Sequence, residues 1–191
     1  STGKMGYAIA RQAMLRGAEV TLVSGPVELT PPPFVEVVPV IRAADMFEAV
    51  KERWESQDII IKAAAVADYT PMQTAEDKIK KKDENMTLSL GRTQDILAWL
   101  GQHKKENQVL CGFSMETRDV LENSMAKLMR KNADMIAANC LKEDGAGFGT
   151  DTNHLSLICK NGVDDLPMLS KEAAADKLLD GLKNLWDGKN G

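Results

Sequence analysis

Residues 59–69 read IIIKAAAVADY, and this stretch decides the fold of the chain. It opens as a continuous apolar run, which is typical of a strand buried on both faces of a parallel sheet. It then changes to small residues and reaches a carboxylate at Asp68. In an open parallel sheet, ligands bind beyond the carboxyl ends of the strands. The small side chains of Ala63 and Ala64 would let a ligand lie against the backbone, although a tightly packed strand end would also use them.

The densest positive charge in the chain follows at residues 78–82, which read KIKKK. The chain as a whole is acidic, with 24 Lys and Arg against 28 Asp and Glu and a net charge of −4. The lysine run is therefore a local feature, and we expect no nucleic-acid partner. A small-residue strand end, a carboxylate and a lysine loop together indicate a polyphosphate pocket, with a solvated charge run as the alternative.

Predicted strands and helices alternate along the rest of the chain. Apolar runs predict strands at 18–24, 34–40, 58–65, 108–113 and 133–139, and another strand is expected at 86–90. A hairpin of strands 155–159 and 165–169 is expected around Asn161-Gly162. This alternation predicts an α/β fold, a Rossmann-like doubly wound and mostly parallel sheet with helices on both faces and a C-terminal β-hairpin. At 191 residues, the chain is expected to form a single domain over 1–191.

The beginning of the chain indicates an incomplete unit. The segment STGKMG at 1–6 leads straight into a helix that Gly17 ends, and the strand at 18–24 follows. Because a helix followed by a buried parallel strand normally has a strand before it, we expect the first strand and most of the first loop to precede residue 1. Gly3 and Gly6 would suit anion binding at the helix N-terminus, although a tight turn explains them equally.

Two more helix starts are marked by side chains that cap helices. Thr93 is the expected N-cap of a helix over 94–103, with Asp95 in its first turn, and Ser170 is the expected N-cap of the last helix.

Cysteine usage and hydropathy indicate the cellular setting. The three cysteines are an odd number without a CxxC pair, which argues against a disulfide framework or a zinc site. Cys111 and Cys140 lie in apolar runs, which favours buried thiols. No stretch approaches 18 apolar residues and no signal peptide is visible. We expect a cytoplasmic protein with no membrane partner.

Four segments of the chain stand out together: AAAVADY at 63–69, KIKK at 78–81, GFSMET at 112–117 and KLMRKNAD at 127–134. With these motifs in this order, the chain resembles the phosphopantothenate–cysteine ligases. STGKMG at 1–6 and AANC…GFG…TN at 137–153 also fit, so the resemblance covers the chain in order.

The resemblance implies a ligase of coenzyme A biosynthesis that joins 4′-phosphopantothenate to L-cysteine. Bacterial members use CTP, through an acyl-cytidylate, and release pyrophosphate and CMP. It further implies Mg²⁺ or Mn²⁺, a homodimer, and a flavin-dependent decarboxylase fused to or associated with the ligase.

The resemblance also implies roles for particular residues. Lys78 would be the catalytic lysine of acyl-cytidylate formation, on a loop that we expect to be mobile without nucleotide, and Asp68 would contact the nucleotide. The other nucleotide- or substrate-binding positions implied are Ala63, Ala64, Gln94, Asp95, Ile96, Leu97, Phe113, Lys127 and Lys131. Gln94 stands where the family often has proline. The family's essential asparagine would lie just before residue 1, and no metal ligand is assigned.

Structural roles remain open for these positions: a cap or turn at Asp68 and at 94–97, core packing for Phe113, and solvated charges for Lys127 and Lys131. Two rival functions also remain open. An NAD(P)-dependent reductase on the same fold would want a charged residue after strand 18–24 and often Tyr-x-x-x-Lys, and neither Tyr7 nor Tyr69 has a lysine four residues on. The second rival is a non-catalytic nucleotide-binding module.

Overall fold

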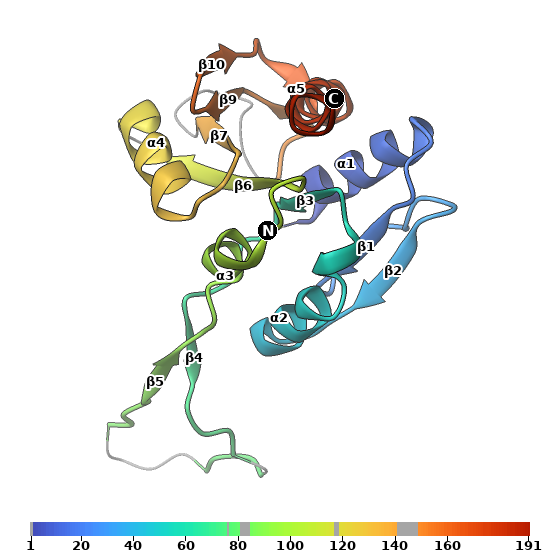
Figure 1. The fold of residues 1–191 in the computed structure, drawn as a ribbon. Helices are drawn as coiled ribbons and strands as arrows, with labels where there is room; N and C mark the ends of the chain where they lie inside the picture. The colour runs from blue at the N-terminus through green and yellow to red at the C-terminus, as the bar shows by residue number, and fades with distance from the viewer. Residues whose placement is uncertain (1, 76, 81–84, 117–118, 141–148) are drawn as a thin grey trace.

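The computed structural model describes residues 2–75, 77–80, 85–116, 119–140 and 149–191. Its central sheet has five strands in the order β10-β9-β7-β6-β3. Strands β3 (Ile59–Lys62), β6 (Val109–Glu116) and β7 (Met135–Cys140) run parallel, and the antiparallel hairpin of β9 (Leu155–Cys159) and β10 (Gly162–Asp165) completes the sheet. Helices cover both faces of this sheet (Figure 1). The predicted α/β architecture with its C-terminal hairpin is confirmed.

The two faces of the sheet form two apolar clusters because strand side chains alternate in direction. Val109 and Cys111 point to the face covered by α1 (Lys4–Leu15) and α5 (Lys171–Asn190). Leu110 and Ile136 point to the opposite face, where α3 (Ile96–His103) and α4 (Val120–Arg130) pack. Helix α2 (Ala43–Lys51) adds Phe47 to this second cluster. These clusters hold the carboxyl ends of β3 and β6 in fixed positions.

Strands β1 (Thr21–Ser24) and β2 (Glu36–Pro39) form a parallel pair of their own. Among the described residues neither pairs with the five-stranded sheet. A second small pair joins β8 (Thr152–Asn153) to β11 (Leu169–Ser170). A 3₁₀ turn (Trp54–Ser56) lies between α2 and β3.

A hairpin arm extends from the body between β3 and α3 (Figure 1). Its two strands, β4 (Tyr69–Pro71) and β5 (Leu90–Arg92), pair antiparallel. The strand expected at 86–90 is wrong in its bounds, since the strand lies at 90–92 and pairs with 69–71. Large apolar side chains of the arm are exposed to solvent, namely Tyr69, Met72, Ile79, Met86, Leu88 and Leu90.

Two other local predictions are corrected by the structure. Asp95, not Thr93, is the N-cap of α3, because its Oδ1 accepts a hydrogen bond from the Ala98 amide at 2.9 Å. Thr93 instead donates its hydroxyl to the Ala67 carbonyl at 2.6 Å. In the C-terminal hairpin the turn is so tight that pairing restarts at Gly162, opposite Cys159, so the second strand lies at 162–165 and not at 165–169.

The cap of the last helix and one of the buried thiols are confirmed. The Ser170 hydroxyl accepts a hydrogen bond from the Ala173 amide at 3.1 Å. Cys111 is fully buried, and burial raises the pKa of its thiol. The side chain of Cys140 lies outside the described part of the structure.

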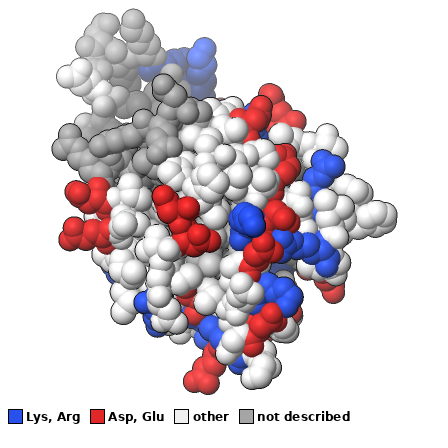
Figure 2. Space-filling view, turned by 90° about the horizontal axis from the view of Figure 1, so that it is seen from above, with Lys and Arg blue, Asp and Glu red and all other residues white. Residues whose placement is uncertain are grey.

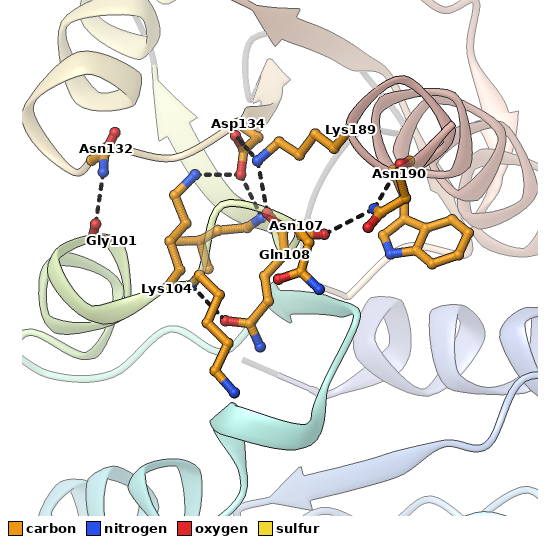
Figure 3. A network of polar contacts seen from close by, with 11 residues as sticks. Gly101, Lys104, Asn107, Gln108, Asn132, Asp134, Lys189 and Asn190 are labelled. Atoms are coloured by element: carbon orange, nitrogen blue, oxygen red, sulfur yellow. Dashed lines mark hydrogen bonds and ion pairs between the residues drawn. The ribbon is translucent and has the colours of Figure 1, made fainter.

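A polar network holds the amino end of the sheet to α5 (Figure 3). The Asp134 carboxylate accepts hydrogen bonds from Lys104 Nζ at 2.5 Å, Lys189 Nζ at 2.8 Å and the Leu110 amide at 2.8 Å. Lys189 also reaches the Gln108 carbonyl at 2.7 Å. These contacts tie α3, β6, β7 and α5 together, far from the carboxyl ends of the strands.

Lysine and arginine lie interspersed with aspartate and glutamate on the face seen in Figure 2. Among the helices of the described residues, none is long and apolar enough to cross a membrane.

Candidate nucleotide site

The carboxyl ends of β1 and β3 meet the first turn of α1. Ala63 directly follows β3, and a Cβ built on Gly6 would lie 4.0 Å from the Ala63 Cβ, so α1 begins beside this strand end. Gly3, with φ of 78°, makes the turn into α1, and a Cβ there would lie 2.9 Å from Val27 Cγ1. The Tyr7 hydroxyl lies 3.1 Å from Ser24 Oγ at the end of β1. The small residues Gly3, Gly6 and Ala63 therefore let these elements approach one another closely.

Asp95 connects this edge to α4. One carboxylate oxygen caps α3, and the other accepts a hydrogen bond from Lys131 Nζ. Lys131 is largely buried, with 15% of its side chain exposed, whereas Asp95 is 52% exposed. Burial acts to raise the pKa of Asp95, but the hydrogen bonds from Lys131 and Ala98 outweigh it, and the pKa is lowered. The ion pair holds a lysine amine at the start of α3.

Lys127 lies in the last turn of α4, one turn before the C-cap residue Lys131, and reaches β6 at the level where β3 ends. Its Nζ donates a hydrogen bond to the Phe113 carbonyl at 2.8 Å. Both lysines are thus drawn onto the protein and are not the freely solvated charges of the alternative interpretation. The Phe113 ring is partly buried and packs against the core on the α1 and α5 face, so core packing accounts for part of its role.

The start of α3 presents its backbone more than its side chains. Ile96 and Leu97 are each 3% exposed and belong to the core between α3 and α4. Gln94 is exposed to solvent. Because the first amides of a helix lack intrahelical partners, residues 94–97 can offer backbone donors to a ligand while Ile96 and Leu97 anchor the helix.

Asp68 lies at the root of the arm, and Lys78 lies farther along it. The Asp68 carbonyl accepts the Thr93 amide at 3.0 Å, at the root of the arm, and the side chain is exposed. Lys78 is exposed farther along the arm. Among the described residues, no hydrogen bond or ion pair joins Lys78 to Asp95, Lys127 or Lys131.

Sequence reasoning missed Lys62. It is the last residue of β3, it lies opposite Gly112 of β6, and it is partly buried. Burial lowers the pKa of its amine, and the charge of Lys127 lowers it further, against the opposite effects of Asp95 and Asp68. The signal was present, since a lysine interrupts an otherwise apolar run, but the run was interpreted only as a strand.

The fold is that of an α/β protein. Its candidate site lies at the carboxyl ends of the parallel strands and combines small residues, helix N-termini and lysine amines. The family described as the C-terminal domain of DNA/pantothenate metabolism flavoproteins matches residues 1–185. The chain belongs to this family, which confirms the resemblance noted from its motifs.

Similar proteins agree with this assignment. The chain is 51% identical over 173 residues to the coenzyme A biosynthesis bifunctional protein CoaBC of Bacillus subtilis (strain 168), covering 90% of this chain and 42% of that protein. The chain thus spans less than half the length of that curated relative. A crystal structure of the C-terminal domain of a CoaBC protein matches with a TM-score of 0.83 and 41% identity, covering 98% of this chain and 85% of the other. A Cab2 mutant in complex with phosphopantothenate-cysteine matches with a TM-score of 0.77 and 15% identity over 98% and 79% of the two chains, a likeness of fold.

Proposed function

We propose that this chain forms the ligase part of an enzyme that joins 4′-phosphopantothenate to L-cysteine with CTP. The carboxylate of phosphopantothenate attacks the α-phosphorus, the bond to the β-phosphate breaks, and pyrophosphate leaves. The cysteine amine then attacks the acyl carbon, loses a proton, and displaces CMP. Family membership and the relative in coenzyme A biosynthesis support the overall reaction. The observation that carries the nucleotide step is the placement of Lys127 and Lys131 at the carboxyl edge of the sheet.

Each part of the edge has a role in this proposal. Lys127 and Lys131 attract the phosphates, and the backbone amides at the start of α3 hold the nucleotide. Ala63 and Ala64 let it lie close to the end of β3. Such donors act more strongly on a developing negative charge when they are fixed before the reaction, and the partners of both lysines fix their amines.

Mg²⁺ or Mn²⁺ is proposed as the metal. Among the described residues, no group of three or more metal-ligating side chains is present. This fits a metal of the magnesium type, which is usually bound by one or two carboxylates together with substrate phosphates. Asp68 would hold it, because no hydrogen bond or ion pair engages its carboxylate among the described residues, whereas both oxygens of Asp95 have partners. The bound metal would offset phosphate charge during loss of pyrophosphate.

Lys78 is proposed as the catalytic lysine, brought to the strand end by movement of the arm or of the nucleotide. The test is Lys78→Gln in the full-length protein, with pyrophosphate release from CTP and phosphopantothenate measured without cysteine. Loss of one preorganised charge contact should lower the rate by about 10²–10³. Lys80→Gln is the matched control on the same arm and should stay near the wild-type rate. Normal formation of the acyl-cytidylate by Lys78→Gln would refute this role.

The reaction itself is tested by pyrophosphate release from each nucleoside triphosphate, with and without phosphopantothenate and cysteine. Release with CTP that requires phosphopantothenate supports the ligase. Binding of nucleotide without turnover would favour the non-catalytic module, and oxidation of NADPH instead would favour the reductase. A homodimer, a cytoplasmic location and a decarboxylase domain elsewhere in the full-length protein are part of the proposal; the last is supported by the bifunctional relative.

A further inference from the structure

Lys62 lies beside the charged residues of the strand-end site. It ends β3 directly before Ala63, and its partner in the parallel ladder is Gly112 of β6. Side chains alternate along β3: Ile60 packs in the cluster of α3 and α4, and Ile59 and Ile61 pack in the other cluster. Lys62 therefore points to the face of α3 and α4, and a lysine ends a row that is otherwise apolar.

Four charged side chains act on the Lys62 amine at this place. The amine of Lys62 interacts electrostatically with the amines of Lys127 and Lys131 and with the carboxylates of Asp95 and Asp68. Counting Lys62, three amines and two carboxylates thus contribute charge here. One of these carboxylates, Asp95, is already engaged by Lys131 and by the Ala98 amide. The cluster holds a surplus of positive charge beside backbone amides that can also donate.

The amine of Lys62 is the unusual member of this cluster. Lys131 donates to Asp95, and Lys127 donates to the Phe113 carbonyl. No hydrogen bond or ion pair engages Lys62 Nζ within the part of the chain that the structure describes. An ammonium that is partly withdrawn from water, near two other amines and without a partner of its own, destabilises the free protein. An anion placed among the three amines would remove this repulsion.

Resting on the proposed function, we infer that Lys62 is a third phosphate-binding lysine, which donates to the polyphosphate of the nucleotide together with Lys127 and Lys131. A lysine amine binds phosphate as a point charge with three donors, and a position next to the start of α3 places it beside the helix amides. The role is binding and not proton transfer, so it concerns the affinity for the polyphosphate part of the ligand and not for the nucleoside.

The test is Lys62→Met in the full-length protein, since methionine keeps an unbranched chain and removes the charge. Titration calorimetry with inorganic pyrophosphate, and separately with CTP, should show binding weakened by about tenfold to a hundredfold. Binding of cytidine, which has no phosphate, should not change. The melting temperature without ligand should rise, because the substitution removes an unpaired amine. Lys62→Arg keeps the positive charge and should retain most of the pyrophosphate affinity. This variant provides a second measurement if Lys62→Met folds poorly.

Lys104→Met is the matched control, because Lys104 is also a largely buried lysine whose pKa is lowered by burial, but it pairs with Asp134 at the other end of the sheet. This variant should lose stability and keep pyrophosphate affinity. Equal pyrophosphate binding by wild type and Lys62→Met would overturn the inference even where CTP is turned over. Weakened pyrophosphate binding without any turnover of CTP would uphold Lys62 and refute the ligase. A wild-type protein that binds neither pyrophosphate nor CTP would overturn both.

Discussion

Replacing Asp134 by asparagine should destabilise the fold strongly. The carboxylate has 14% of its side chain exposed and accepts charged hydrogen bonds from Lys104 and Lys189 as well as the Leu110 amide. An asparagine oxygen can still accept from Leu110, but its amide group turns a donor toward two ammonium groups. Removing one partner of a largely buried ion pair costs about 3–5 kcal/mol. In a chain of 191 residues this corresponds to a melting temperature lower by roughly 6–20 °C.

The pH dependence gives this prediction a second measurement. Burial acts to raise the pKa of Asp134, but its hydrogen bonds from Lys104 and Lys189 outweigh that effect and the pKa is lowered. A carboxylate with a lowered pKa contributes its stability above its ordinary pKa of about 3.9 and loses it as the pH falls through the lowered value. Thermal melts followed by circular dichroism should show a constant gap between the proteins from about pH 7 to pH 5, closing below about pH 4.

The control for Asp134→Asn is Asp187→Asn, which breaks an exposed pair with Lys183 and should change stability by less than about 1 kcal/mol. An Asp134 variant that melts within a degree of wild type at pH 7 would refute the reasoning. A gap that persists unchanged at pH 3 would show that the carboxylate's charge is not its source.

Substitutions at two further positions probe the start of α3 and its contact with the end of α4. Asp95→Asn should keep the helix cap but lose the ion pair with Lys131, whereas Asp95→Ala loses both, so the Ala variant should be less stable than the Asn variant by about 1 kcal/mol in a denaturant titration; equal stabilities of the two variants would argue against the cap. Gly101→Ala should lower the melting temperature, since its Cβ would lie 1.8 Å from the Lys131 carbonyl oxygen, at a cost of about 1–3 kcal/mol. Gly188→Ala, which meets no atom within 4 Å, is its control, and equal melting temperatures for the two variants would contradict this.

The fold could be predicted because the buried strands are marked by their own composition. The apolar run at 59–61 and the run at 109–111 each pack on both faces of the sheet, as a continuous apolar run predicts. The first residue of a helix was less predictable where more than one neighbouring residue could serve as the N-cap. Thr93 and Asp95 both suit an N-cap, and the choice depends on which one reaches the Ala98 amide.

The arm and the pairing of Lys131 with Asp95 depend on contacts that local patterns do not encode. Strands β4 and β5 are short, and their partners are separated by about twenty residues that carry many charges, so periodicity does not reveal the ladder. Lys131 reaches Asp95 because the end of α4 approaches α3 at Gly101, where the Asn132 amide donates to the Gly101 carbonyl at 2.7 Å. That approach is a consequence of packing between helices. The family resemblance supplied Asp95 and Lys131 as site residues, but not the ion pair that joins them.

Lysines with lowered pKa values occur at both ends of this sheet, and their partners separate two kinds of role. At the amino end, Lys104 is desolvated but donates to Asp134, so its charge is compensated within the fold. At the carboxyl end, Lys62 is desolvated beside two other amines, and no described residue accepts its hydrogens. Burial alone therefore does not distinguish a structural lysine from a binding one. The distinction comes from whether the folded chain itself supplies a direct acceptor for the ammonium, and at Lys62 we propose that a ligand supplies it.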